Sequence, residues 1–296
     1  MTKTAHSEEL VYTAAEDGVP LEGVVIRPSG GAAHDVAVVW VHGLSSRFYS
    51  PTGVRIGRAL ASRGYLFLAG NNRGHDAGFV IRRPHESELS LGGGIWEMLS
   101  ESPLDVAAWV TYAAGLPGVR GVLLVGHSLG AIKVGYYAAT HEDSRVLGLV
   151  AASAPGSTVS PDPALLKQSQ EMFTSGRGRD LLPWGSTRAG AGTMSASSYL
   201  DRWQDGGSHF DVYGLRSLEQ GSGRSAPLVA SIRKPLFALY GGDEAWVGGA
   251  VELETIKRNA TGAPRVETRF FPDADHSYTR HETEVADQFA AWAATL

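Results

Sequence analysis

A serine with glycine two positions before and two positions after it is the residue of this sequence best placed for covalent chemistry. Ser128 stands in Gly126-His127-Ser128-Leu129-Gly130, between the apolar run 122–125 and the helix-compatible segment 131–139. A tight turn from strand to helix strains the serine backbone, and side chains at the two glycine positions would clash. Such a turn lifts the hydroxyl clear of the sheet and directs free helix N–H groups toward the reacting atom. The pattern predicts a nucleophile beside an anion site.

An acid and a base follow the serine, and each comes after a predicted strand. Asp243 ends the Gly-Gly-Asp turn behind the apolar run 236–240, and His276 follows a strand predicted over 266–271. Nucleophile, acid and histidine occur in this chain order in the fold that carries its serine on such a turn, with the acid after a later strand and the base after the last one. The sequence therefore predicts Ser128, Asp243 and His276 as a catalytic triad.

Two turns upstream extend the set of motifs. His42-Gly43-Leu44 follows a predicted strand, and Asn71-Asn72-Arg73-Gly74-His75 follows the next one. With these turns the chain resembles the α/β-hydrolase superfamily, and within it the serine esterases and lipases. The resemblance implies an α/β-hydrolase fold with an oxyanion hole formed by the backbone N–H groups of Leu44 and Leu129. Asn71 stands where the family's D-x-R-G-H turn usually has Asp, a structural departure that leaves the chemistry untouched.

Four residues are alternatives to these assignments or neighbours of them. Glu244 competes as the acid, but the Gly-Gly-Asp turn matches the family position and favours Asp243. His281 competes as the base, but we expect it at the start of the last helix. Asp275 adjoins the predicted base, yet adjacent side chains in a loop rarely reach back to orient a ring. His127 is expected to point away from the serine and to pack at the base of the turn.

The predicted parts suggest a reaction. Ser128 attacks a carbonyl carbon, His276 takes its proton and later returns it, and Asp243 orients the histidine. Water then hydrolyses the acyl-enzyme. We therefore expect a serine hydrolase of carboxylic esters, with thioesters and lactones included. An acyltransferase, a perhydrolase, a C–C hydrolase or a serine peptidase would use the same triad. A binding or sensor protein on this scaffold is the non-enzymatic alternative, against which the apparently complete triad argues.

The order of predicted elements indicates an α/β protein. A hairpin is expected from strands near 10–13 and 21–26, joined by the turn at 16–18. Further strands are predicted near 36–41, 65–69, 122–126, 146–151, 235–240 and 266–271. Helices are predicted near 52–63, 103–115, 129–140, 249–259 and 282–294. This alternation predicts a mainly parallel central sheet with helices on both faces.

One long stretch, 156–225, interrupts the alternation. Residues 1–155 and 226–296 are therefore predicted to form the hydrolase core, and the stretch between them a helical cap or lid, because this family inserts a cap at that point. A structureless loop of this length would be exceptional, so helices are expected within it. A shorter break near 78–95 is expected at the same rim.

Apolar residues within the long stretch predict its helices and its contribution to a substrate pocket. One helix face is expected to carry Leu165, Leu166, Met172 and Phe173, and another Tyr199, Leu200 and Trp203. Plausible pocket-lining residues, none of them decisive, are Trp184, Trp203, His209 and the later Trp246.

Composition excludes several classes of protein. The 296 residues are 43% hydrophobic and 19% charged, as in a soluble globular protein, and the net charge of −5 gives no reason to expect nucleic acid. The absence of cysteine excludes disulfides and thiolate chemistry. No nucleotide-binding glycine motif and no helical histidine pair occurs, so no cofactor or metal is implied.

Location and partners follow from the same composition. No run approaches the ~20 apolar residues of a membrane span, and the N-terminus lacks the apolar segment of a signal peptide. We therefore expect a cytoplasmic protein that acts on a small ester-type molecule, and a homo-oligomer is compatible with these features.

Overall fold

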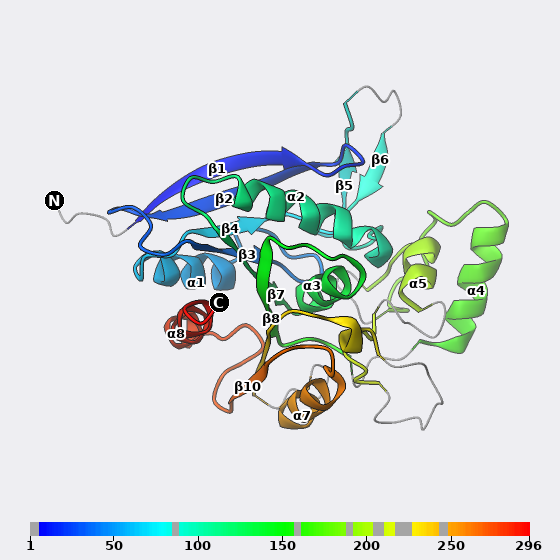
Figure 1. The fold of residues 1–296 in the computed structure, drawn as a ribbon. Coiled ribbons are helices and arrows are strands. Elements are labelled where there is room, and N and C mark those ends of the chain that lie inside the picture. Colours follow the sequence, from blue (N-terminus) through cyan, green and yellow to red (C-terminus); the bar gives the residue numbers. More distant parts are fainter. Residues whose placement is uncertain are drawn as a thin grey trace.

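An eight-stranded sheet forms the centre of the protein in the computed structural model (Figure 1). The structure describes residues 6–84, 89–156, 161–187, 192–203, 210–216, 227–242 and 248–296. The strands lie in the order β1-β2-β4-β3-β7-β8-β9-β10. Their bounds are β1 His6–Ala14, β2 Pro20–Pro28, β3 Val36–Val41, β4 Phe67–Gly70, β7 Gly121–His127, β8 Val146–Ala152, β9 Leu236–Gly241 and β10 Val266–Phe271. β1 pairs antiparallel with β2, and β2 with β4, whereas β4, β3, β7, β8, β9 and β10 are mutually parallel.

Burial along the strands explains the apolar runs of the sequence. Every residue of β3 and of β9 is buried, because helices cover both faces of these central strands. β10 lies at the edge of the sheet and mostly alternates between half-buried and exposed residues. The continuous apolar runs thus belong to the middle of the sheet, where the site residues emerge.

Helices pack on both faces of the sheet, as predicted. The helices are α1 Pro51–Ala61, α2 Ser102–Ala114, α3 Leu129–Thr140, α7 Ala250–Asn259 and α8 Glu282–Ala293. Buried residues of α1 and α8 pack with Trp40 on one face. Buried residues of α2, α3 and α7 pack with Val39 on the other face. Since Val39 and Trp40 are consecutive in β3, the two-residue period of the strand divides the core into these two clusters.

A small hairpin stands apart from the main sheet. β5, Phe79–Ile81, pairs antiparallel with β6, Ser90–Gly92, and the pair projects above the sheet in Figure 1. The sequence predicted only an irregular break here. Each strand has three residues, too few for a recognisable alternating pattern, and a run of glycines follows β6.

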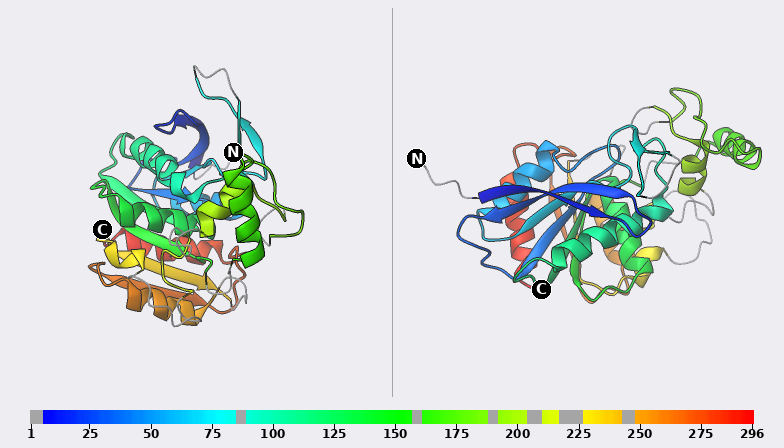
Figure 2. Two further views of the ribbon diagram at one scale, coloured as in Figure 1. Left: turned by 90° about the vertical axis from the view of Figure 1, so that its right-hand side faces the viewer. Right: turned by 90° about the horizontal axis from the view of Figure 1, so that it is seen from above.

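The interrupting stretch carries two described helices, α4 Pro163–Thr174 and α5 Ala196–Trp203. Seen from above, they extend beyond one end of the sheet (Figure 2). Backbone and side-chain bonds tie this stretch to the loop after β6: Ser195 N–H donates to Ile95 O (2.9 Å), and Ser100 N–H donates to Asp201 Oδ2 (3.1 Å).

One expectation about apolar residues in this stretch needs correction. Leu165 and Met172 are buried on α4, but Phe173 is 55% exposed, so the predicted four-residue face is wrong for Phe173. Of the two tryptophans, Trp184 is 78% exposed, whereas Trp203 is buried. The stretch stands partly away from the core, and its outer side therefore keeps apolar residues in solvent.

Candidate active site

Ser128 occupies a sharp turn between β7 and α3. It is the N-cap residue of α3, with φ 56° and ψ −127°, a conformation that costs energy for a residue with a side chain. The two glycines make the turn possible. A Cβ on Gly126 would lie 2.2 Å from Gly130 O, and a Cβ on Gly130 would lie 2.1 Å from Val41 O. The sequence-predicted strand-turn-helix geometry is therefore present around Ser128.

Backbone bonds hold the turn in place. Ser128 N–H donates to Ala152 O of the neighbouring strand (2.8 Å), and Ala131 N–H donates to Ser128 O (2.9 Å). Leu129 is the first residue of α3, where backbone N–H groups have no partner within a helix. The Leu129 N–H thus has the position expected of a donor to an anion beside Ser128.

The turn after β3 lies against the serine. β3 is the neighbour of β7, with Val41 opposite Gly126, so the two strands end side by side. A Cβ on Gly43 would lie 2.8 Å from Ser128 Cβ and 3.2 Å from Ser128 Oγ. Only glycine permits this approach, and it places the following residue, Leu44, next to the turn that carries Ser128.

His42 orients the peptide between Gly43 and Leu44. The Asn72 N–H donates to His42 Nε2 (3.2 Å), so Nε2 accepts and Nδ1 carries the ring proton. Nδ1 then donates to Gly43 O (2.8 Å), which also accepts from Ser46 N–H (3.3 Å). In a planar trans peptide the N–H points opposite to the C=O, so fixing the Gly43 carbonyl fixes the Leu44 N–H. Sequence reasoning missed this role of His42, although its place in the turn before Gly43 was visible.

His276 lies in the loop after β10, close to the serine turn. Its backbone carbonyl accepts from His127 Nε2 (2.8 Å), and the centroids of the two rings are 4.9 Å apart. Burial, together with the smaller effect of the neighbouring His127, lowers the pKa of His276 to about 3. The structure thus brings the predicted base next to the residue that precedes Ser128.

His127 packs as the sequence suggested and has a second contact. Its ring stacks on Trp40, with centroids 5.5 Å apart and planes 16° from parallel. Because a carbonyl only accepts, His127 Nε2 must carry the proton that it donates to His276 O. His127 therefore holds the loop of the predicted base against the serine turn.

Asp275 is engaged by the backbone of its own loop. Its Oδ1 accepts from Ser277 N–H (3.0 Å) and from Thr279 N–H (2.8 Å). These bonds lower the pKa of the carboxyl, although partial burial opposes them. The observation agrees with leaving Asp275 out of the triad, and His281 is the N-cap residue of α8, as expected.

Asp243, Glu244, Trp246 and His209 lie outside the described residues. The residues before Asp243 are described. A Cβ on Gly241 would lie 2.5 Å from Asp275 O, and Gly242 N–H donates to Phe271 O (2.8 Å). The end of β9 therefore runs beside the loop that carries the predicted base.

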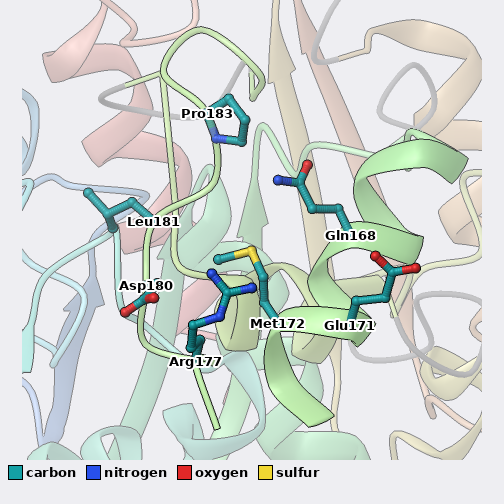
Figure 3. Close-up of a pocket in the computed structure, with 7 residues that line it drawn as sticks. All are labelled: Gln168, Glu171, Met172, Arg177, Asp180, Leu181 and Pro183. Atoms are coloured by element: carbon teal, nitrogen blue, oxygen red, sulfur yellow. The ribbon is translucent and has the colours of Figure 1, made fainter. Parts of the chain in front are cut away.

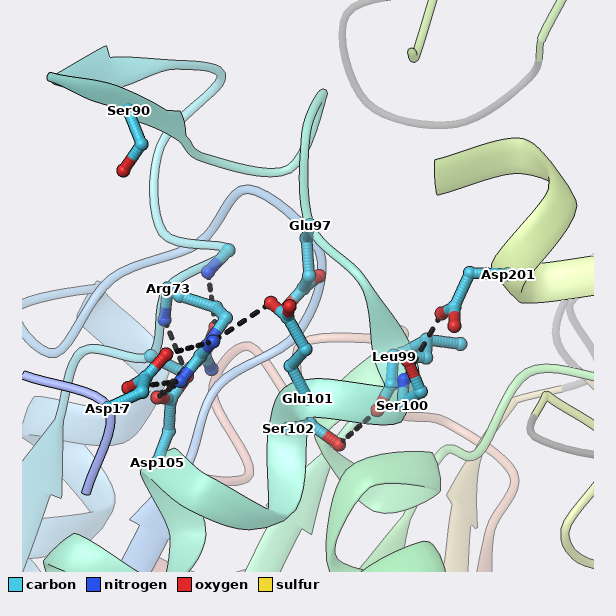
Figure 4. Close-up of polar contacts among 12 residues, drawn as sticks. Asp17, Arg73, Ser90, Glu97, Leu99, Ser100, Glu101, Ser102, Asp105 and Asp201 are labelled. Carbon is cyan, nitrogen blue, oxygen red and sulfur yellow. Dashed lines mark hydrogen bonds and ion pairs between the residues drawn. The ribbon is translucent and has the colours of Figure 1, made fainter. Parts of the chain in front are cut away.

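Arg73 anchors the turn that follows β4. It is buried, and its guanidinium pairs with Asp105 (2.9 Å), Asp17 (3.0 Å) and Glu101 (2.8 Å), as Figure 4 shows. Arg73 also donates its backbone N–H to Asp105 Oδ2 (2.7 Å). These bonds fix the turn that contains Asn72 and hence the ring of His42.

Acid is expected to destabilise the fold through His42, His127 and His276, whose pKa values burial lowers below the ordinary 6.5. Below that pH the unfolded chain binds protons that the folded chain excludes. The free energy of unfolding is therefore retained above pH 6.5 and falls as the pH drops, by about 1.4 kcal/mol per pH unit for a fully buried histidine and by less for half-buried rings. Denaturant titrations between about pH 7.5 and 5.5 measure this slope. An identical slope in His127→Phe would contradict the assignment of His127.

A cavity of about 430 Å³ opens between α4 and the chain after it (Figure 3). Neither Ser128 nor His276 is among the residues that line it. Its lining residues are Gln168, Glu171, Met172, Arg177, Asp180, Leu181 and Pro183.

The described residues contain no group of three or more acidic or histidine side chains that could hold a metal ion. None of the described helices has the length and apolar character of a membrane span.

Comparisons with known proteins agree with the fold described above. The model of the alpha/beta hydrolase family matches residues 38–291. Est1E from Butyrivibrio proteoclasticus, solved with ferulic acid bound, is 16% identical, with a TM-score of 0.65 and coverage of 97% of this chain and 100% of the other. The esterase Pf2001 from Pyrococcus furiosus is 20% identical, with a TM-score of 0.59 and coverage of 98% and 94%.

A third structure, DcsB in complex with its substrate analogue, is 13% identical, with a TM-score of 0.68 and coverage of 98% of this chain and 99% of the other. The search of curated proteins gives no match. At these identities the structures show a shared fold. Since the family model spans most of the sequence, the chain belongs to the alpha/beta hydrolase family.

Proposed function

We propose that this hydrolase cleaves a carboxylic ester, thioester or lactone through a triad of Ser128, Asp243 and His276. The strained backbone of Ser128 is the observation that carries the proposal. Strain of this kind is retained where it exposes a nucleophile, because a relaxed turn would serve packing equally well. The contacts of Gly43 with the serine and of His127 with the His276 loop support it.

The proposed reaction uses groups of this chain, the substrate and water. Ser128 Oγ bonds to the carbonyl carbon while His276 takes its proton, and the tetrahedral oxyanion accepts from the N–H groups of Leu44 and Leu129. The bond from this carbon to the leaving oxygen, or to the leaving sulfur of a thioester, then breaks as His276 returns the proton to the leaving group. Water, activated by the same ring, hydrolyses the acyl-enzyme to release the acid, and Asp243 orients the ring and stabilises its cation.

Residues 156–225 are proposed to cap this site, with 1–155 and 226–296 as the core. The hydrogen bonds between this stretch and the loop at 95–100 support the proposal, because Gly94 at the start of that loop lies against Leu44 and Ser45. Such a cap would supply binding surface for the part of the substrate that does not react. We also propose a cytoplasmic location and a small-molecule substrate.

The cap proposal predicts a change of selectivity in Trp203→Ala. Trp203 is buried, its ring packs at a tilt against Phe210 (5.0 Å between centroids), and the guanidinium of Arg216 lies over it. Removing its ring should shift the preferred acyl size and raise KM for bulky esters several-fold, with little effect on aryl acetates. Kinetics on aryl esters of graded acyl length measure this shift, and Trp184→Ala at an exposed position is the matched control. An equal loss of activity on every ester would contradict the proposal that the cap binds substrate and takes no part in the reaction itself.

The reaction class is tested by competing acceptors. The purified protein is offered aryl esters of graded length, thioesters, lactones and hydroxycinnamate esters, since ferulic acid is bound to Est1E. Water, an alcohol, an amine or peroxide is the acceptor in parallel reactions. Acid and alcohol as the main products support a hydrolase. Preferential transfer to another acceptor would replace the hydrolase assignment with a transferase or a perhydrolase, and no turnover with any of them would contradict it.

A further inference from the structure

A fully buried ion pair lies beside the serine turn. Lys133, on α3, and Glu97, in the loop after β6, are 0% and 3% exposed. The Lys133 ammonium donates to Glu97 Oε1 and to Asn72 Oδ1 (2.8 Å). Burying two charges costs free energy that their attraction often does not offset, so stability alone is a weak reason for such a pair. The hydrogen bond from Lys133 to Asn72 indicates another reason for the pair.

Lys133 settles the orientation of the Asn72 side chain. An ammonium has donors only, so it must face the Oδ1 of Asn72 and not its NH₂ group. Gly74 N–H donates to the same oxygen (3.1 Å). The Asn72 NH₂ group is then left to donate to His42 O (3.4 Å), while the Asn72 backbone N–H donates to His42 Nε2. Both ends of His42 are thus held by one residue that Lys133 orients.

We propose that Lys133 is a positioning residue for the oxyanion hole, acting through Asn72 and His42 to fix the direction of the Leu44 N–H. The last link is the bond from His42 Nδ1 to Gly43 O, whose peptide carries that N–H. This inference rests on the proposed function, because it assigns the Leu44 N–H to a developing oxyanion.

The positive charge of Lys133 also helps to keep His42 in the form that orients the Leu44 N–H. A protonated His42 would lose its acceptor at Nε2 and with it the bond from Asn72 N–H. Burial lowers the pKa of His42 well below its ordinary value, and the positive charge of Lys133 lowers it further. The lysine therefore helps to keep the ring in the neutral form that the network requires.

Glu97 supplies the balancing charge and connects the network to the proposed cap. The carboxylate of Glu97 favours the charged form of the buried Arg202 on α5, whose pKa burial lowers. Figure 4 shows Glu97 in the loop that leads to Ser100, which Asp201 of α5 holds. Glu97 thus balances the charge of Lys133, whose other hydrogen bond goes to Asn72 in the turn after β4.

The test compares the wild-type protein with the double variant Lys133→Met/Glu97→Gln. Either single substitution would strand the other buried charge and strongly destabilise the protein, whereas the double variant removes both charges. For aryl acetate hydrolysis we expect the double variant to stay folded, with kcat roughly tenfold to hundredfold below that of the wild type and with KM changed less than about twofold. If the pair were merely structural, a folded double variant would keep the wild-type kcat.

A second readout does not depend on turnover. In protein labelled with ¹⁵N-leucine, the Leu44 amide resonance is expected to move in the double variant, while that of Leu10, on the edge strand β1, stays in place. Equal kcat in the wild type and the folded double variant, or an unmoved Leu44 resonance, would overturn the inference. An inactive wild-type protein would instead overturn the proposed function, and the Leu44 resonance would still decide whether Lys133 positions that amide.

Discussion

Replacing Ser128 by alanine is expected to reduce ester hydrolysis by at least about 10⁴-fold and to leave the protein folded. The reaction loses its nucleophile, whereas the turn keeps a small side chain in the same strained conformation. Initial rates on an activated aryl ester measure the loss, and circular dichroism with thermal unfolding checks the fold. Activity near the wild-type level would show that another residue attacks the substrate.

Ser128→Gly provides a matched control for the strain. Glycine adopts a φ of 56° without penalty, so this variant should be as inactive as Ser128→Ala and more stable than the wild type by about 1 kcal/mol. A glycine variant less stable than the wild type would mean that the serine contributes to folding. That result would contradict the argument that the strain at Ser128 is retained because it exposes a nucleophile.

Asp243→Asn is expected to lower turnover by about 10⁴-fold, by analogy with the same substitution in a serine protease triad. The amide cannot hold the histidine in the required tautomer, nor stabilise its cation. Steady-state kinetics on the same aryl ester measure the effect, with KM expected to change much less than kcat.

Two variants control for the choice of acid. Glu244→Gln should have a small effect, because the Gly-Gly-Asp turn favours its neighbour. Asp275→Asn should also have a small effect on turnover, since the Asp275 carboxylate is occupied by the N–H groups of Ser277 and Thr279. A larger loss in either variant than in Asp243→Asn would transfer the role to that residue.

The sequence predicted the sheet and its main helices because long apolar runs and glycine turns determine them locally. The β3, β7 and β9 runs are buried on both faces, and each was recognisable without the structure. The hairpin of β5 and β6 was missed, since three-residue strands carry too little periodicity. Phe173 was misplaced because helical spacing predicts which residues share a face and does not say how wide the buried part of that face is.

The site was predictable only where a motif fixes the backbone. The turn at Ser128 follows from two glycines, and His276 follows from the order of strands. The roles of His42 and Lys133 depend on which side chains meet across β3, β4 and α3, elements far apart in the chain. The sequence shows a lysine five residues after the serine, but neither its burial nor its partners Glu97 and Asn72.

Covalent labelling of Ser128 tests the central claim most directly. The wild-type protein is treated with a serine-directed fluorophosphonate, and mass spectrometry of the intact chain and of its peptides locates the adduct. We predict a single adduct per chain, on Ser128, with loss of esterase activity in proportion to labelling. The adduct should be absent from Ser128→Ala. An adduct on another residue, or no adduct in a protein that hydrolyses esters, would contradict the assignment of Ser128 as the nucleophile.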